Sequence, residues 1–343
     1  MSQKRQITNE HRKKEEWHEW KKQSLSYQHI QERGLLPNLE ALEEEGYTVL
    51  TPEQIADPGI LERARAAILR LLEENTGVKH DIETGAHGSI DTWAQSQGQY
   101  LLYGFLEKDP VFEEIIQHPM TLPFMEYFLG PDCLLSSLTC FIKWQNEEGY
   151  GPELGLHADD LMPFFAPMPD PPQVFNSNWF LTDYTKANGA FCVVPGSHKL
   201  RRQPSTGEGV EDAIPVEGPA GSVVVFHGNL WHGAFPRVNP GLRISINPFM
   251  VGYHYRVQEN FQGRISDEML ARNGVRFRKL LNIDDIWGHE DWRGPIPWHE
   301  RASGKTWSEL MRDPVQINGK DYRIVLDRNE RPSMLAYVPV EVD

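Results

Sequence analysis

Five short runs of β-forming residues, separated by Gly, Pro, Asn or Asp, occupy the middle of this 343-residue chain. In chain order they read LLSSLTCFIKW, VFNSNWFLTDY, AFCVVPG, GSVVVFHG and LRISINPFM. Strands this short, bounded by turn-forming residues, are typical of antiparallel sheets. The pattern therefore predicts a mainly β core, an antiparallel barrel or sandwich, at about residues 130–255.

Helical segments surround this core. The first residues are very polar and have helical propensity, with Asn9 as a candidate cap and Gly34 as a stop signal. We expect residues 1–37 to form a helical extension and residues 38–343 a single domain, which ends in a helical and hairpin segment at 256–343. Further helices are expected at 60–75, where apolar residues recur at helical spacing, and within 109–130.

Composition limits the partners. The formal charge of −15 argues against nucleic acid or an anionic membrane and leaves a small molecule as the expected partner. The three cysteines lie in apolar stretches and are expected to be buried thiols of a reducing compartment. With no apolar stretch of membrane-spanning length, we expect a cytoplasmic protein. Its oligomeric state does not follow from the sequence.

The stretch GLHADDL places His157 and Asp159 one residue apart. In an extended segment, residues i and i+2 point to the same face with their Cα atoms about 7 Å apart, so both side chains can reach one ion. A solvated pair is the alternative. A second His-X-Asp, at His289 and Asp291, lies in a Trp- and Pro-rich stretch without a strand pattern and is expected to be a loop.

A third ligand follows the buried strand GSVVVFHG. His232 comes after a Gly-Asn turn, and His227, five residues earlier, is its rival. Two histidines and one carboxylate form the facial triad of non-haem Fe(II) oxygenases. The metal ligands expected here are His157, Asp159 and His232. Such a centre leaves open positions for a bidentate 2-oxo acid and for O2.

The strand GLRISINPF carries a cation that suits this co-substrate. Alternation places Arg243 and Ser245 on one face of the strand, and a buried arginine is costly unless an anion meets it. The guanidinium matches the second carboxylate of 2-oxoglutarate with two parallel hydrogen bonds, and Ser245 can donate a third. A protein carboxylate from elsewhere in the fold is the alternative partner.

Together, His157-Ala-Asp159, NGAFCVVPGSHK at 188–199 and WHGAFPRVNPGLR ending at Arg243 resemble the phytanoyl-CoA dioxygenase family of Fe(II)- and 2-oxoglutarate-dependent oxygenases. The resemblance runs from about Leu42 to about Phe249. It implies a double-stranded β-helix, or jelly roll, with the triad binding iron and Arg243 binding the co-substrate. Halogenating members replace the carboxylate of the triad with Gly or Ala, so the retained Asp159 implies hydroxylation or a related C–H oxidation.

The sequence departs from some members of the family near the co-substrate. Ala234 stands where some have a serine, and Asn178 where some have a tryptophan. Two other classes of function stay open. One is a jelly roll that binds a metal or ligand without turnover, and the other is a zinc-dependent hydrolase.

Other polar residues near the motifs have simpler interpretations. His198, in the PGSHK turn, is expected to be structural, and Lys199, Arg201 and Arg202 belong either to a solvated turn or to a phosphate-binding rim. The Met-, Phe- and Pro-rich segment after the metal motif is a candidate rim for an apolar substrate, although it could equally cover the core. Its expected substrate contacts are Met162, Phe164 and Phe165.

Overall fold

The computed structural model describes residues 21–22, 24–85, 98–160, 167–261 and 263–283, and the backbone of three strands after residue 314. The chain divides into two compact units. One comprises Arg33–Ile283, and the other comprises Met1–Glu32 together with Asp284–Asp343. The domain boundaries expected from the sequence stay a prediction.

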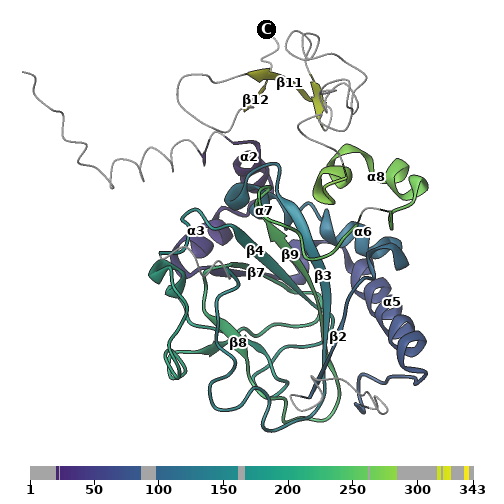
Figure 1. Ribbon diagram of the computed structural model, residues 1–343, viewed down its shortest axis with the longest axis vertical. Coiled ribbons are helices and arrows are strands. Elements are labelled where there is room, and N and C mark those ends of the chain that lie inside the picture. Colours follow the sequence, from purple (N-terminus) through teal and green to yellow (C-terminus); the bar gives the residue numbers. More distant parts are fainter. Residues whose placement is uncertain are drawn as a thin grey trace, which may run out of the picture. The chain divides into compact units, whose positions relative to one another are not determined.

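Two antiparallel sheets form the centre of the larger unit (Figure 1). The six-stranded sheet has the order β1-β7-β4-β9-β3-β2, and the three-stranded sheet has the order β6-β5-β8. The strands are β1 (Tyr47–Leu50), β2 (Gln99–Leu102), β3 (Leu134–Lys143), β4 (Val174–Phe180), β5 (Phe191–Val193), β6 (Ile214–Pro215), β7 (Val223–His227), β8 (His232–Ala234) and β9 (Arg243–Val251).

The interior of the jelly roll lies between these sheets. Phe180 of β4 and Phe226 of β7 belong to the same buried cluster as Phe191 and Val193 of β5. Side chains of the two sheets therefore meet in one core. The mainly β prediction is confirmed, and the five β-rich runs are strands β3, β4, β5, β7 and β9.

Alternation along β4 separates two environments. Asn176 pairs in register with Phe226, which faces the interior, whereas Phe175 stacks on Phe128 with ring centroids 4.4 Å apart. Since successive side chains of a strand point to opposite faces, Asn176 and Asn178 face the interior while Phe175 and Trp179 face the helices. The interior wall is therefore partly polar.

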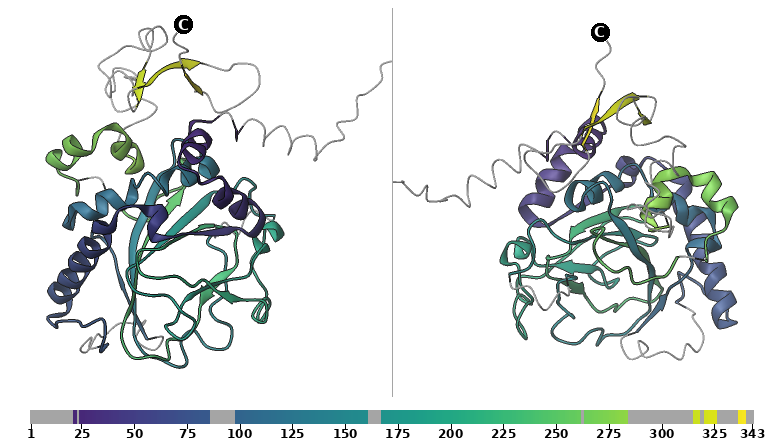
Figure 2. Two further views of the ribbon diagram at one scale, coloured as in Figure 1. Left: turned by 180° about the vertical axis from the view of Figure 1, so that it is seen from behind. Right: turned by 45° about the horizontal axis from the view of Figure 1, so that its top comes forward.

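Helices cover the outer face of the six-stranded sheet (Figure 2). Helix α5 buries Ile60, Ala64, Ala67, Ile68 and Leu71, which recur at helical spacing, as expected from the sequence. The helices of this unit are α3 (Leu36–Glu45), α4 (Pro52–Ile55), α5 (Pro58–Thr76), α6 (Pro110–Ile116), α7 (Leu122–Leu129) and α8 (Asp267–Leu280), with short 3₁₀ turns η2 (Leu106–Lys108) and η3 (Ser197–Leu200).

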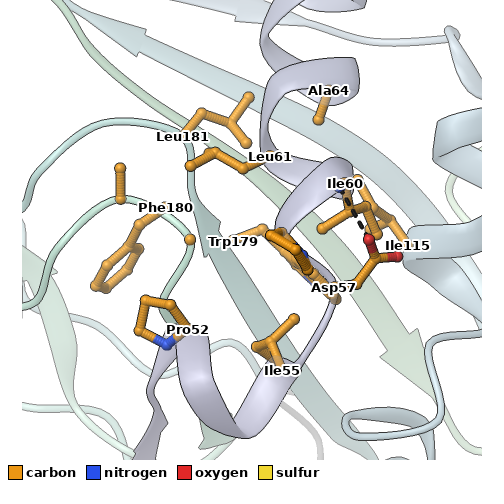
Figure 3. A pocket seen from close by; sticks show the side chains of 13 residues that line it. Pro52, Ile55, Asp57, Ile60, Leu61, Ala64, Ile115, Trp179, Phe180 and Leu181 are labelled. Carbon is orange, nitrogen blue, oxygen red and sulfur yellow. Dashed lines mark hydrogen bonds between the residues drawn. The ribbon is translucent and has the colours of Figure 1, made fainter.

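An apolar cavity of about 190 Å³ lies on this outer side (Figure 3). Trp179 of β4 lines it together with Ile55 and with Ile60 and Ala64 of helix α5. Because Trp179 and Asn178 point to opposite faces of β4, this cavity lies on the other side of the sheet from the polar interior wall.

The smaller unit contains helix α2 and a three-stranded sheet of order β10-β11-β12. Their bounds are α2 (Leu25–Glu32), β10 (Val315–Ile317), β11 (Lys320–Val325) and β12 (Ala336–Pro339). Strands β11 and β12 pair antiparallel, which confirms the expected C-terminal hairpin. The candidate cap Asn9 lies outside the described residues. No helix in the described part of the chain has the length and apolar character that a membrane crossing requires.

Gly46 joins α3 to β1 in a conformation that only glycine adopts readily. Its φ is +85°, and a Cβ atom there would lie 2.5 Å from Nδ1 of His198 and 2.9 Å from Cδ1 of Leu230. Gly77, which ends α5 at φ +69°, has nothing within 4 Å of the corresponding position. The first glycine is therefore required by both backbone and packing, and the second by backbone alone.

We expect Gly77→Ala to lower the free energy of unfolding by about 1 kcal/mol through backbone strain. Gly46→Ala should cost about 3 kcal/mol, because the methyl group also collides with buried side chains. Urea unfolding of both variants measures the difference. Equal losses would show that His198 and Leu230 move aside without cost.

Candidate metal centre and co-substrate pocket

The side chains of His157, Asp159 and His232 converge beside strand β8, whose first residue is His232. Nε2 of His157 lies 3.5 Å from Oδ1 of Asp159, and Nε2 of His232 lies 3.4 Å from Oδ2 of the same carboxylate. One ligand atom from each residue lies within 4.8 Å of the others. Among the described residues, these three are the His, Cys, Asp or Glu side chains whose ligand atoms lie close enough together to hold one metal ion.

Backbone hydrogen bonds bring these residues together. His157 and His232 form an isolated antiparallel bridge in which each amide donates to the other's carbonyl at 2.9 Å. The Asp159 amide donates to the Gly228 carbonyl at 2.8 Å. The segment that carries His157 and Asp159 is thus attached to β8 and its preceding turn by these separate backbone hydrogen bonds and not by a continuous ladder. It is not a regular strand, although the two side chains converge as the spacing suggested.

The orientation of both imidazole rings suits a metal. Nδ1 of His157 lies 2.7 Å from the Gly155 carbonyl, and Nδ1 of His232 lies 2.9 Å from the Leu230 carbonyl. Because a carbonyl only accepts hydrogen bonds, Nδ1 carries the proton in each ring. The lone pair of each Nε2 is left directed toward the carboxylate, as in metal sites whose histidines are oriented by backbone carbonyls.

The charges of His232 and Asp159 support the same arrangement. At His157 burial lowers the pKa, but the hydrogen bond and charge of Asp159 outweigh it and raise the pKa above its usual value, so a metal ion would have to displace a proton shared with the carboxylate. Burial lowers the pKa of His232 to about 4 despite the opposing effect of Asp159, so this ring is neutral at pH 7. Burial alone would raise the pKa of Asp159, but His232 and His157 lower it below its usual value. A neutral imidazole and an ionised carboxylate are the protonation states that bind a divalent metal.

Asn176 holds the carboxylate from the opposite wall. Its Nδ2 donates to Oδ2 of Asp159 at 2.5 Å, and the Asn176 side chain is fully buried on β4. Asn176 was not among the site residues expected from the sequence. The alternation of two asparagines in the apolar run VFNSNWF was the available signal, because it places both amides on one strand face.

The rival histidines lie elsewhere. His227 pairs in register with Phe175, on the face of the sheet that meets the helices, and its ring packs 6.0 Å from that of Phe128. His198 is buried, with Nε2 3.3 Å from the Glu43 carbonyl, in keeping with a structural role. His289 and Asp291 lie outside the described residues.

Arg243 points from the six-stranded sheet into the interior of the jelly roll. It is 4% exposed at the start of β9, and its guanidinium lies 5.0 Å from the ring centroid of Tyr184. Ser245, two residues on, pairs with Phe180 of the interior cluster, so Arg243 and Ser245 share the interior face. Within the described residues, Nε of Arg243 has no hydrogen-bond partner, and no carboxylate forms an ion pair with its guanidinium.

Several buried polar atoms on this wall have no hydrogen-bond partner within the described structure. They include Nε of Arg243 and Oδ1 of Asn178, while the hydroxyls of Ser245 and Tyr184 have at most each other as a partner. Buried polar groups are nearly always paired, because an unpaired one costs about 1 to 3 kcal/mol. Such a group of unpaired atoms around a cation fits a pocket for an anionic ligand with polar atoms along its length.

The other residues singled out in the sequence either have partners within the protein or lie outside the described residues. Lys199 pairs with Glu44 at 2.8 Å, Arg202 pairs with Glu208, and Arg201 donates to the Met168 carbonyl at 2.6 Å. These contacts favour the solvated turn over a phosphate-binding rim. Met162, Phe164 and Phe165 lie outside the described residues, so the substrate rim stays a prediction.

Comparison with known proteins assigns the family. Residues 42–245, more than half of the chain, match the model of the phytanoyl-CoA dioxygenase family. The chain belongs to this family. Membership supports an oxygenase that uses Fe(II), 2-oxoglutarate and O2, the cofactors expected from the sequence, and the donor set of the triad fits Fe(II).

Individual relatives are distant. The dioxygenase af480 of Aspergillus fumigatus is 26% identical over 233 residues, which cover 67% of this chain and 73% of that protein. Phytanoyl-CoA dioxygenase 1 of Oryza sativa subsp. japonica is 28% identical over 144 residues, which cover 37% of this chain and 50% of its own. The chain thus spans about half the length of some relatives that it matches.

Solved structures also resemble this chain. HygX from Streptomyces hygroscopicus, described with nickel and 2-oxoglutarate bound, is 14% identical with a TM-score of 0.49, covering 68% of this chain and 92% of that one. AviO1 from Streptomyces viridochromogenes is 21% identical with a TM-score of 0.48, covering 64% of this chain and 95% of that one.

We expect His232→Ala to weaken Fe(II) binding by more than about a hundredfold, because it removes a direct ligand. His227→Ala is the matched control, since His227 is also buried but faces the helices. This variant should keep its iron affinity and lose thermal stability. Oxygen-free equilibrium dialysis and thermal unfolding measure the two properties. Equal loss of iron from both variants would contradict the assignment.

Proposed function

We propose that this protein is an Fe(II)- and 2-oxoglutarate-dependent dioxygenase that oxidises a C–H bond of a small, partly apolar organic substrate, with hydroxylation as the outcome. One observation carries the proposal. A 2-His-1-carboxylate group and a buried arginine without a carboxylate partner line the same barrel interior. A metal-binding protein without turnover or a zinc hydrolase needs the first group but has no use for the second.

Each of these residues has a defined part in this proposal. His157, Asp159 and His232 would hold the metal, with Asn176 orienting the carboxylate and two backbone carbonyls orienting the rings. Arg243 would bind the remote carboxylate of 2-oxoglutarate, and Ser245 would donate to it. When bound there, Fe(II) supplies the oxidising chemistry with O2 and the co-substrate. The side chains of Asp159 and His232 are 15% and 7% exposed, so this part of the site has little access to water.

Two features bear on the reaction and substrate. Asp159 occupies its position as a carboxylate bonded to Asn176, which leaves no small-residue gap of the kind that halogenation requires and supports hydroxylation. The His157 side chain is 49% exposed, so the centre opens toward solvent on this side. A substrate would enter here, and the predicted contacts Met162, Phe164 and Phe165 follow His157 closely in the sequence.

Conversion of 2-oxoglutarate to succinate tests the function directly. We expect succinate release to require both Fe(II) and O2, and to increase when a substrate is present in a library of metabolites. Mass spectrometry should then detect a product that is heavier by one oxygen atom. Hydrolysis with Zn(II), or metal binding without any succinate release, would support the other two classes.

Arg243→Met tests the co-substrate pocket. Loss of a charge-assisted pair worth about 1.5 to 3 kcal/mol should raise the Kd for 2-oxoglutarate about ten- to a hundredfold and leave the affinity for metal unchanged. Without co-substrate the variant should be at least as stable as the unaltered protein, because an unpaired buried charge is removed. Calorimetric titration of the metal-loaded, oxygen-free protein measures the Kd.

Arg237→Met is the matched control for this experiment. Arg237 is also a buried arginine, but its guanidinium donates to the carbonyls of Gly241, Pro240 and Asn188. Its loss should destabilise the fold without a direct effect on 2-oxoglutarate binding. An Arg243→Met variant that unfolds early yet binds 2-oxoglutarate normally would show that Arg243 is structural.

A further inference from the structure

Lys143 is a second buried cation beside Arg243. It is the last residue of β3, its relative exposure is 0%, and it pairs in register with Arg243 of β9. Residues directly opposite each other in neighbouring strands point to the same face of the sheet. Lys143 therefore lies on the interior face with Arg243.

Neither cation has an acidic partner within the described structure. The ammonium of Lys143 donates one hydrogen bond, 2.8 Å long, to the Phe235 carbonyl, and lies 4.8 Å from the ring centroid of Tyr150. Nε of Arg243 is unpaired. Two positive charges side by side in a buried site repel each other and lose their hydration, so the fold alone does not account for their presence.

We propose that Lys143 acts with Arg243 to hold the carboxylate of 2-oxoglutarate that lies away from the metal. The inference rests on the proposed function. An ammonium has three N–H donors, and the Phe235 carbonyl accepts from one of them. The other donors can turn to an anion, whose charge would offset the repulsion between Lys143 and Arg243.

The surroundings of Lys143 give the proposal a measurable signature. Burial and then the charge of Arg243 lower the pKa of Lys143 to about 7, against a small opposing effect of Cys192. The groups that face it are Arg243 of β9, Cys192 of β5, Tyr150 and the neutral Gln99 of β2. Burial raises the pKa of Cys192 to about 12, so its thiol is neutral at pH 7.

The affinity for 2-oxoglutarate should fall as the pH rises above about 7. A bound carboxylate favours the protonated amine and raises the pKa of Lys143 in the complex. Below pH 7 the amine is already charged, and binding moves no proton. Above pH 7 the ligand-free amine is largely neutral, so binding takes up a proton, and affinity for 2-oxoglutarate falls as pH rises toward the pKa of the complex.

The unaltered protein provides the first test. The metal-loaded, oxygen-free protein is titrated with 2-oxoglutarate at pH 8 in two buffers of different ionisation enthalpy, and the difference in heat gives the proton uptake. From a pKa of about 7 we expect uptake of about 0.9 proton per ligand. The analogue 2-oxopentanoate, which lacks the second carboxylate, should cause none. Equal uptake with both ligands, or none with either, would overturn the role of Lys143.

Lys143→Met provides the second test. We expect the Kd for 2-oxoglutarate at pH 6.5 to rise about tenfold, the proton uptake at pH 8 to vanish, and metal affinity to stay the same. The matched control is Lys186→Met, because Lys186 lies 4.7 Å from the ring of Phe235 but is exposed. That variant should bind 2-oxoglutarate as the unaltered protein does.

Binding of 2-oxoglutarate to the unaltered protein and to Lys143→Met distinguishes a wrong function from a wrong role for Lys143. If the unaltered protein binds no 2-oxoglutarate, the proposed function is wrong and the role of Lys143 is wrong with it. If the unaltered protein binds 2-oxoglutarate and Lys143→Met binds it equally well, only the role of Lys143 is wrong. A lower Tm for Lys143→Met with unchanged affinity would make Lys143 a structural residue.

Discussion

The pair of backbone hydrogen bonds between His157 and His232 is the interaction on which the site depends. These residues are far apart in sequence, and each amide donates to the other's carbonyl at 2.9 Å. The bridge aligns two imidazoles whose Nδ1 atoms are already committed to carbonyls, so both Nε2 atoms meet the Asp159 carboxylate. The Asp159 amide, which donates to the Gly228 carbonyl, and the Asn176 side chain, which donates to the carboxylate, hold the same segment at further points.

The second constraint is the alternation of β4 and β9, which assigns different tasks to the two faces of one sheet. The outer face carries Phe175 and Trp179 against helices, and the hydrophobic effect stabilises that layer. On the interior face, Arg243 and Asn178 have polar atoms without partners. Unpaired buried polar atoms reduce stability, and a chain retains them where a ligand completes their hydrogen bonds. The outer face thus carries mainly apolar packing, and the interior face carries the polar residues of the candidate site.

Much of this arrangement follows from the sequence, because it depends on local periodicity. The β-rich runs, the helix at Pro58–Thr76 and the interior position of Arg243 all follow from period-2 or helical spacing. Residue type, order and the family resemblance together predict the triad. The first two are chemical requirements that do not depend on the details of packing.

Other features depend on contacts between distant segments and could not be predicted. The run LLSSLTCFIK is almost entirely buried and contains a register shift between Leu135 and Ser137, so alternation alone does not show where Lys143 points. Asn176 gains its role only from the approach of Asp159. His227 lies on the face of the sheet that packs on the helices, as its pairing with Phe175 shows, whereas the sequence left it as the less favoured alternative to His232.

Thermal unfolding without oxygen tests most directly whether the triad and the cationic pocket serve one ligand. A molecule that chelates the metal and meets Arg243 at its other end must bind more tightly when metal is present, and the two ligands must strengthen each other equally. We predict that Fe(II) raises Tm, that 2-oxoglutarate raises it further, and that 2-oxoglutarate without metal has a much smaller effect. The same increase in Tm from 2-oxoglutarate with and without metal would contradict the account.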